Sequence, residues 1–145
     1  MDSTLLDLFG AKYERKGSTP NTYDCKSLFV EVMNRYGHPI KTPDIEVLAI
    51  EQVLAAEARG EYAYTEIDAN MIQSEIASGR WEKIDQPEEG CAVVIALDPA
   101  KPNLVQHLGV YIGDNKFIHI LKNMGVITTR LDDRFFERKI RGFYK

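Results

Sequence analysis

Apolar residues recur with the period of an α-helix in the first half of the chain. Three segments, 25–36, 43–60 and 67–76, carry apolar side chains three and four positions apart, which is typical of amphipathic helices. Gly37 marks the end of the first segment, and a shorter apolar segment at 5–9 predicts one or two helical turns. The first half of the chain is therefore predicted to be helical.

The second half of the chain changes to the pattern of β-strands. Residues 91–97 form a nearly unbroken apolar segment, which indicates a strand that is buried on both faces. A short helix or a turn is expected at 131–137. Shorter β-type segments lie at 105–112, 116–121, 126–129 and 140–144. Helices that precede strands predict an α+β fold, in which N-terminal helices pack on a C-terminal antiparallel sheet.

The hairpin over 105–121 is expected to turn through a three-residue loop at 113–115, because that register collects aliphatic side chains on one face. A two-residue loop at 114–115 would mix polar and apolar side chains on each face. Asn115 is expected to take a positive φ, which asparagine tolerates. The expected pairs are Ile112 with Lys116, Val110 with Ile118, and Leu108 with Ile120.

The other face of this hairpin brings two histidines together. Tyr111 is predicted to lie opposite Phe117, and Gly109 opposite His119. His107 is then the diagonal neighbour of His119, roughly 7 to 8 Å away between backbones, which two imidazole rings or a linking hydrogen bond can span. Because Gly109 has no side chain, it leaves the space between the two rings open.

Cys25 stands where a helix is predicted to begin, with Asp24 as the N-cap. Unpaired backbone N–H groups and the positive end of the helix dipole favour a thiolate in the first turn, so Cys25 is a candidate nucleophile. The alternative interpretation is a small buried side chain on the inner face of the helix. With His107 as proton acceptor and His119 as the group that orients it, Cys25 meets the requirements of thiol acyl transfer.

Zinc is the competing use of cysteine and histidine side chains. His38 is the only further histidine, and no CxxC or HxxxH spacing occurs. No metal site is therefore predicted, and the thiol chemistry needs no cofactor.

Charge, hydropathy and length limit the classes of protein and of partner that fit this sequence. The net charge of −4 and the pI near 5.4 disfavour nucleic acid as a partner, and no apolar stretch approaches the length of a membrane-spanning helix. The length fits a single domain over 1–145. In the absence of a signal-peptide pattern, we expect synthesis in the cytoplasm, with Cys25 and Cys91 as free thiols. The oligomeric state is not predicted.

Two segments resemble the NlpC-type cell-wall peptidases, a family of papain-like cysteine enzymes. Residues 23–29, Tyr-Asp-Cys-Lys-Ser-Leu-Phe, are similar to the nucleophile motif aromatic-Asp-Cys-(Ser or Trp)-Gly-Leu-(Val or Ile), with Lys26 and Ser27 as departures. Residues 106–119 are close to the family's His-Val-Gly-Ile-Tyr-(Ile or Leu)-Gly-x-Gly-x-(Phe or Met)-(Ile or Leu)-His stretch. The order cysteine, histidine, histidine also follows the family.

The resemblance implies a papain-like NlpC fold and hydrolysis of an amide bond in a peptidoglycan stem peptide, of the type γ-D-glutamyl to a diamino acid, through a thioester. In that mechanism Cys25 attacks, His107 acts as base and then as acid, and His119 orients His107. Tyr13 falls in a segment similar to the family's Tyr-x-x-Gly-Gly, so Tyr13 and Asp24 are expected on the substrate and oxyanion side of the site.

The C-terminal segment 129–144 resembles the phage and prophage branch of the family. This implies a place in a virion tail, other tail proteins as partners and action at the bacterial cell wall. Cys91 stands where the family has an aspartate, which implies a structural role for this thiol.

Two alternative functions stay open. Lys16 and Lys26 favour an inactive structural or binding tail module, and the three candidate catalytic residues equally permit a thiol amidase or acyltransferase on a non-wall substrate.

Overall fold

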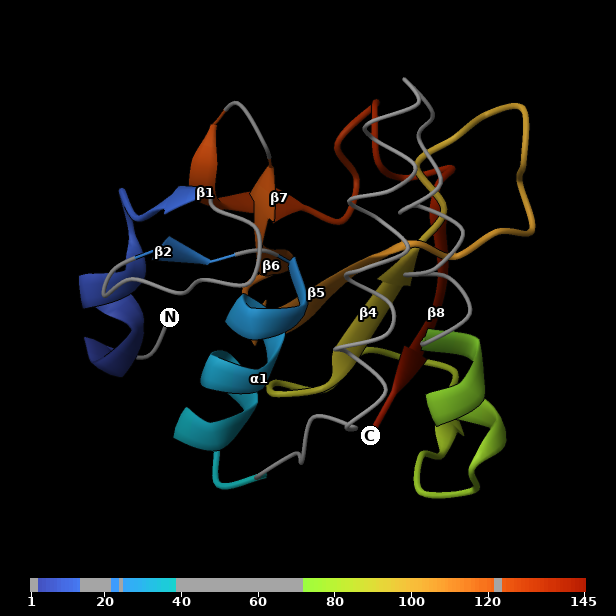
Figure 1. Cartoon of the computed structure of the whole chain (residues 1–145), viewed down its shortest axis with the longest axis horizontal. Helices are drawn as coiled ribbons and strands as arrows, with labels where there is room; N and C mark the ends of the chain where they lie inside the picture. Colours follow the sequence, from blue (N-terminus) through green and yellow to red (C-terminus); the bar gives the residue numbers. More distant parts are fainter. Residues whose placement is uncertain (1–2, 14–21, 24, 39–71, 122–123) are drawn as a thin grey trace, which may run out of the picture.

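The computed structural model describes residues 3–13, 22–23, 25–38, 72–121 and 124–145 (Figure 1). A 3-10 helix, η1, spans Ser3–Leu8, and the α-helix α1 spans Cys25–Arg35. A further helical segment covers 72–77. The strands are β1 Lys12–Tyr13, β2 Thr22–Tyr23, β3 Lys83–Ile84, β4 Ala92–Ile95, β5 His107–Gly113, β6 Lys116–Leu121, β7 Gly125–Arg130 and β8 Ile140–Tyr144.

Six of these strands form one antiparallel sheet in the order β3-β8-β4-β5-β6-β7. Figure 1 labels the part of this order from β8 to β7. β5, β6 and β7 follow one another along the chain and across the sheet, which confirms the predicted antiparallel meander. β8 returns across the sheet and lies between β3 and β4. β1 and β2 form a separate parallel pair. The α+β fold class is confirmed.

The helices predicted for the first half are confirmed where the structure describes them. α1 matches the first of them and is followed by Gly37 with a φ of 81°. The segment 72–77 is the end of the third, and η1 is the short N-terminal turn, in 3-10 form. The second predicted helix, over 43–60, lies outside the described residues. Residues 131–137 form turns.

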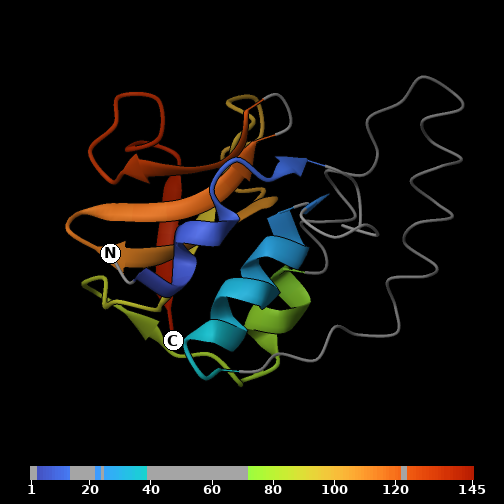
Figure 2. The ribbon, with the colours of Figure 1, turned by 90° about the vertical axis from the view of Figure 1, so that its left-hand side faces the viewer.

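Helices cover one face of the sheet. α1 and the 72–77 segment lie on the same side of it (Figure 2). The cluster under α1 contains Leu28, Phe29, Val32 and Met33 together with Val110, Ile112, Ile118, Ile120 and Val126. The segment 131–139 covers the opposite face, where the cluster is Val93, Ile95, Phe117 and Phe136. β4 is buried throughout and serves both clusters, as the apolar segment 91–97 predicted.

The tip of the β5–β6 hairpin differs from the prediction. Gly113 pairs with Lys116, so the loop has only Asp114 and Asn115, with φ of 53° and 60°. Both residues take the left-handed conformation, which aspartate and asparagine tolerate better than most residues and which suits the twist of a hairpin. The predicted three-residue loop and the pair of Ile112 with Lys116 are therefore wrong. The positive φ of Asn115 is confirmed.

A β-bulge between Tyr111 and Gly113 restores the predicted register below the tip. Val110 pairs with Ile118 and Tyr111 pairs with Phe117, as predicted. The bulge adds the residue that the shorter loop removes. Every side chain back to the start of β5 therefore keeps its predicted face, because one step of register would have reversed them all.

The first residue of β7 lies against the N-terminal segment. The backbone N–H of Val126 donates a hydrogen bond of 3.0 Å to the carbonyl oxygen of Ala11. Gly125 has a φ of +73°, and a Cβ atom added to it would lie 2.5 Å from that same oxygen. Glycine is therefore required here both by the backbone conformation and by the close approach of two chain segments.

Replacing Gly125 with alanine is expected to lower the free energy of unfolding by about 2 to 5 kcal/mol, because left-handed strain and overpacking add. Gly79→Ala is the matched control, since Gly79 has a φ of +83° and open space around its missing Cβ. The control is expected to lose only about 1 to 2 kcal/mol. Urea unfolding measures both, and equal losses would show that the contact with Ala11 is unimportant.

Candidate active site

The two histidines of the β5–β6 hairpin form a hydrogen-bonded pair. His107 is the first residue of β5, and His119 lies in the middle of β6. Nε2 of His107 lies 2.9 Å from Nδ1 of His119, and the ring planes are inclined at 71°. This confirms that the two rings share one face within hydrogen-bonding reach. The bond engages Nε2 of His107, so Nδ1 is the ring nitrogen left for a thiol.

Gly109 makes room for this pair, as predicted from its lack of a side chain. A Cβ atom added to Gly109 would lie 2.8 Å from Cδ2 of Phe117 and 3.5 Å from Cβ of His119. Both contacts come from the strand that carries the second histidine. A larger residue at 109 would therefore push β5 and β6 apart at the level of the two rings.

A third side chain, which was not among the residues predicted for the site, extends the pair. Nε2 of His119 lies 2.7 Å from Oγ1 of Thr129 on β7. His119 pairs directly with Ile127, so Thr129 is its diagonal neighbour on β7, just as His107 is on β5. A predicted register for the β6–β7 hairpin would have placed Thr129 beside His119. The strand at 126–129 was predicted, but no register was assigned to it.

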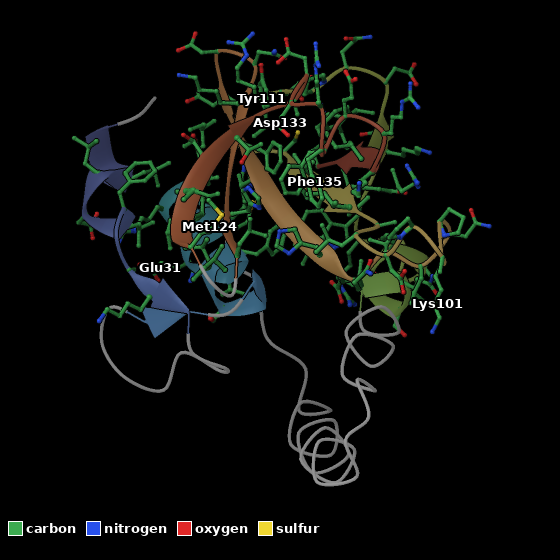
Figure 3. The ribbon with its side chains drawn as sticks, turned by 90° about the horizontal axis from the view of Figure 1, so that it is seen from above. Glu31, Lys101, Tyr111, Met124, Asp133 and Phe135 are labelled. Carbon is green, nitrogen blue, oxygen red and sulfur yellow. The ribbon has the colours of Figure 1, made fainter. Side chains whose placement is uncertain are left out.

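Aromatic rings separate His119 from water. The ring centroid of Phe117 lies 4.6 Å from that of His119, and Phe136 meets it edge-on at 5.0 Å. Phe136 belongs to the segment after β7, which the labelled Asp133 and Phe135 mark in Figure 3. Asp133 holds this segment in a turn, since its carbonyl oxygen accepts the N–H of Phe136 and its Oδ1 accepts the N–H of Phe135.

Burial keeps both rings neutral. Desolvation lowers the pKa of His107 to about 4, and the pKa of His119 is lowered further by desolvation and by the neighbouring His107. The two side chains are 4% and 0% exposed. At neutral pH His107 is therefore an uncharged imidazole that can accept a proton, as a general base must.

Cys25 is the first residue of α1, as predicted, so its backbone stands at the positive end of the helix dipole. The side chains of Cys25 and Tyr13, and the whole of Asp24, lie outside the described residues. The catalytic roles of Cys25, His107 and His119 therefore stay predictions, as do the substrate and oxyanion roles of Tyr13 and Asp24.

The backbone nevertheless brings the elements that carry these residues together. α1 packs against the aliphatic face of β5 and β6, and the two histidines lie on the other face of the same strands. Tyr13 of β1 pairs with Tyr23 of β2, two residues before Cys25. The segment that carries Tyr13 therefore runs beside the start of the helix that carries the candidate nucleophile.

The second thiol lies in a different environment. Cys91 is 2% exposed, and burial raises the pKa of its thiol. This agrees with the structural role expected for it.

Within the described ranges, no group of three or more histidine, cysteine, aspartate or glutamate side chains could hold a metal ion. No helix among the residues that the structure describes is long and apolar enough to cross a membrane.

Alkylation should distinguish the two thiols. At about pH 6 to 7, iodoacetamide is expected to modify Cys25 at least about tenfold faster than Cys91, because a thiolate at a helix start reacts and a buried thiol does not. Peptide mass mapping over a time course measures both rates in one sample. The same experiment after unfolding in urea is the control, since the two rates should then converge. Equal rates in the folded protein would contradict a low pKa for Cys25.

Comparisons with known proteins identify the family and the fold of the chain. The model of the NlpC/P60 family matches residues 10–145. The chain is similar to the structure of NlpC2 from Trichomonas vaginalis, with a TM-score of 0.63 and 18% identity over 98% of this chain and 45% of that one. It is also similar to NlpC1 from the same organism, with a TM-score of 0.52 and 20% identity over 94% of this chain and 40% of that one. The chain thus spans less than half the length of either structure, and these likenesses show a shared NlpC fold. No curated protein matches the sequence.

Proposed function

The chain belongs to the NlpC/P60 family, and on this premise we propose that it is a cysteine peptidase that hydrolyses amide bonds in peptidoglycan stem peptides. The observation that carries the proposal is the buried hydrogen bond of 2.9 Å between His107 and His119. The bond lies on β5 and β6, on the face opposite to the one that α1 covers, and α1 begins at Cys25. A neutral, oriented imidazole and a thiol at a helix start are the parts that thiol acyl transfer needs.

The proposed reaction passes through a thioester. His107 takes the proton of Cys25, and the sulfur attacks the carbonyl carbon of the amide. His107 then gives that proton to the nitrogen as the C–N bond breaks, which releases the amine and leaves the acyl group on sulfur. A water molecule, deprotonated by His107, attacks the thioester, and its C–S bond breaks. The products are a carboxylic acid and the original thiol.

The negative charge on the carbonyl oxygen needs donors during both attacks. The backbone N–H of Cys25 is proposed as one of them, because N–H groups at a helix start are already aimed at a developing anion. Tyr13 and Asp24 are proposed to line this side of the site. By resemblance, the bond cleaved is γ-D-glutamyl to a diamino acid, and the place of action is the bacterial cell wall, reached as part of a phage tail.

Incubation with purified peptidoglycan tests this proposal. Mass analysis of the soluble products should show stem-peptide fragments that begin with a free diamino acid amine. The matched substrate is peptidoglycan whose stem peptides have been removed beforehand by an amidase, from which no such fragments can arise. Absence of any released peptide would contradict peptidase activity on the wall.

A second candidate function is a structural or binding module without turnover. It is favoured by Lys26 and Ser27, which replace two positions of the nucleophile motif. This candidate predicts that the protein sediments with insoluble peptidoglycan but releases nothing from it. A third candidate function is that of a thiol amidase or acyltransferase on a non-wall substrate. It predicts turnover of small amides or thioesters, with neither binding to peptidoglycan nor release of peptides from it.

A further inference from the structure

We propose that Thr129 is a positioning residue, which fixes the tautomer of His119 and through it the proton on His107. The proposal rests on the proposed function, because it assigns His107 as the base for a thiol. Its observations are the two hydrogen bonds of His119, 2.9 Å from Nδ1 to His107 and 2.7 Å from Nε2 to Thr129. Each ring nitrogen of His119 therefore has one partner.

A neutral imidazole carries a proton on one nitrogen only, so the two bonds of His119 must run in the same direction. In the first arrangement, Nε2–H of His107 donates to Nδ1 of His119, and Nε2–H of His119 donates to Oγ1 of Thr129. Nδ1 of His107 is then unprotonated and can take the proton of a thiol. After it does so, Nε2–H of His107 still has its acceptor.

In the reverse arrangement, the hydroxyl of Thr129 donates to Nε2 of His119. Nδ1–H of His119 then donates to Nε2 of His107, and the proton of neutral His107 lies on Nδ1. That is the nitrogen at which the proton of the thiol must arrive, so His107 cannot act as the base. Only the first arrangement is compatible with catalysis, and it requires an oxygen acceptor at position 129.

The surroundings of His119 make this acceptor necessary. His119 is 0% exposed, and the rings of Phe117 and Phe136 lie against it. When an apolar side chain of the same volume stands at position 129, the N–H of His119 loses its acceptor, and a buried N–H without an acceptor is unfavourable. Without the oxygen of Thr129, His119 is expected to move its proton to Nδ1, where His107 can accept it. This shift converts the pair into the arrangement that cannot accept a proton from a thiol.

Three variants test the role of the hydroxyl group. Thr129→Val keeps the shape of the side chain but removes the acceptor, and it is expected to lower kcat on peptidoglycan by about 10- to 100-fold. Thr129→Ser keeps the oxygen and is expected to retain kcat within about threefold. Thr128→Val is the matched control, because Thr128 pairs with Ile118, which packs under α1, and lies on the other face of β7.

The tautomer itself is the second readout, and it does not depend on turnover. Nitrogen-15 NMR of the imidazole side chains should show His119 protonated on Nε2 in the wild-type protein and in Thr129→Ser, and on Nδ1 in Thr129→Val. If peptidoglycan is not cleaved, the NMR result still decides the role of Thr129. If Thr129→Val does not fold, the wild-type spectrum and the kcat of Thr129→Ser decide it.

The proposal is overturned by any of three results. The first is an Nδ1–H tautomer of His119 in the wild-type protein. The second is equal kcat for Thr129→Val and Thr128→Val. The third is a loss in Thr129→Ser as large as that in Thr129→Val, since this would make side-chain volume, and not the oxygen, the property that matters.

Discussion

Replacing Cys25 with alanine is expected to reduce peptidoglycan cleavage by about 10⁴-fold or more, to below detection, because the thioester cannot form without the sulfur. Release of stem-peptide fragments, followed by mass analysis, measures the loss. The helix should survive the change, since alanine is the best helix former and position 25 is the first of α1. Circular dichroism and the urea midpoint check that the fold is kept.

Cys91→Ala is the matched control for Cys25→Ala. It removes the other thiol from a buried position just before β4, so it is expected to lower stability but to keep turnover. Wild-type turnover in Cys25→Ala would exclude covalent catalysis by this thiol. Loss of turnover in a folded Cys91→Ala variant would indicate that Cys91, and not Cys25, is the nucleophile.

The two histidines should differ in how much activity their loss removes. His107→Ala is expected to lower turnover by about 10⁴-fold, and His119→Ala by about 10²-fold, because transfer of the proton matters more than orientation of the ring that transfers it. Initial rates of peptide release measure both variants. A larger loss in His119→Ala than in His107→Ala would reverse the assignment of the two roles.

Conservative variants at position 119 separate orientation from packing. His119→Asn and His119→Gln are expected to recover more activity than His119→Ala, since an amide oxygen can accept the Nε2–H of His107. The asparagine oxygen can reach about the position of the histidine Nδ1, which lies 2.9 Å from His107. His119→Leu is the control that fills the space without an acceptor, and recovery by leucine would show that only volume is required.

The alternation of side chains along the strands predicted the register of the hairpin. The aliphatic and aromatic faces of the hairpin required Val110 opposite Ile118 and Tyr111 opposite Phe117, and burial of one face left no other register. The predicted length of the loop was wrong because a two-residue turn with a bulge gives the same register as a three-residue loop. Asp114 and Asn115 both tolerate positive φ, so the two-residue turn was available.

Other features depend on partners that a single sequence does not reveal. The period of residues 140–144 predicts a strand, but the position of β8 between β3 and β4 follows from tertiary packing. β1, β2 and β3 have two residues each, too short to produce a periodic pattern.

The candidate site was predictable to the extent that its residues lie on one hairpin. His107 and His119 could be placed together because Gly109 and the register of β5 and β6 relate them directly. Thr129 and Phe136 come from segments that follow the hairpin, and their contacts with His119 depend on the β6–β7 register and on the turn after β7. Shielding and orientation of the second histidine could therefore not be derived from the hairpin alone.

The contact between Ala11 and Val126 has a consequence for association between copies of this protein. β7 is one outer strand of the sheet, and an outer strand with unpaired N–H and C=O groups is a template on which another chain can add. The carbonyl of Ala11 occupies the N–H of Val126 at the start of β7, with β1 alongside it. The opposite outer strand, β3, has only two residues. In the described part of the chain, β3 is thus too short to be a good template and β7 is covered at its start, so edge-to-edge addition of another copy is restricted to the end of β7.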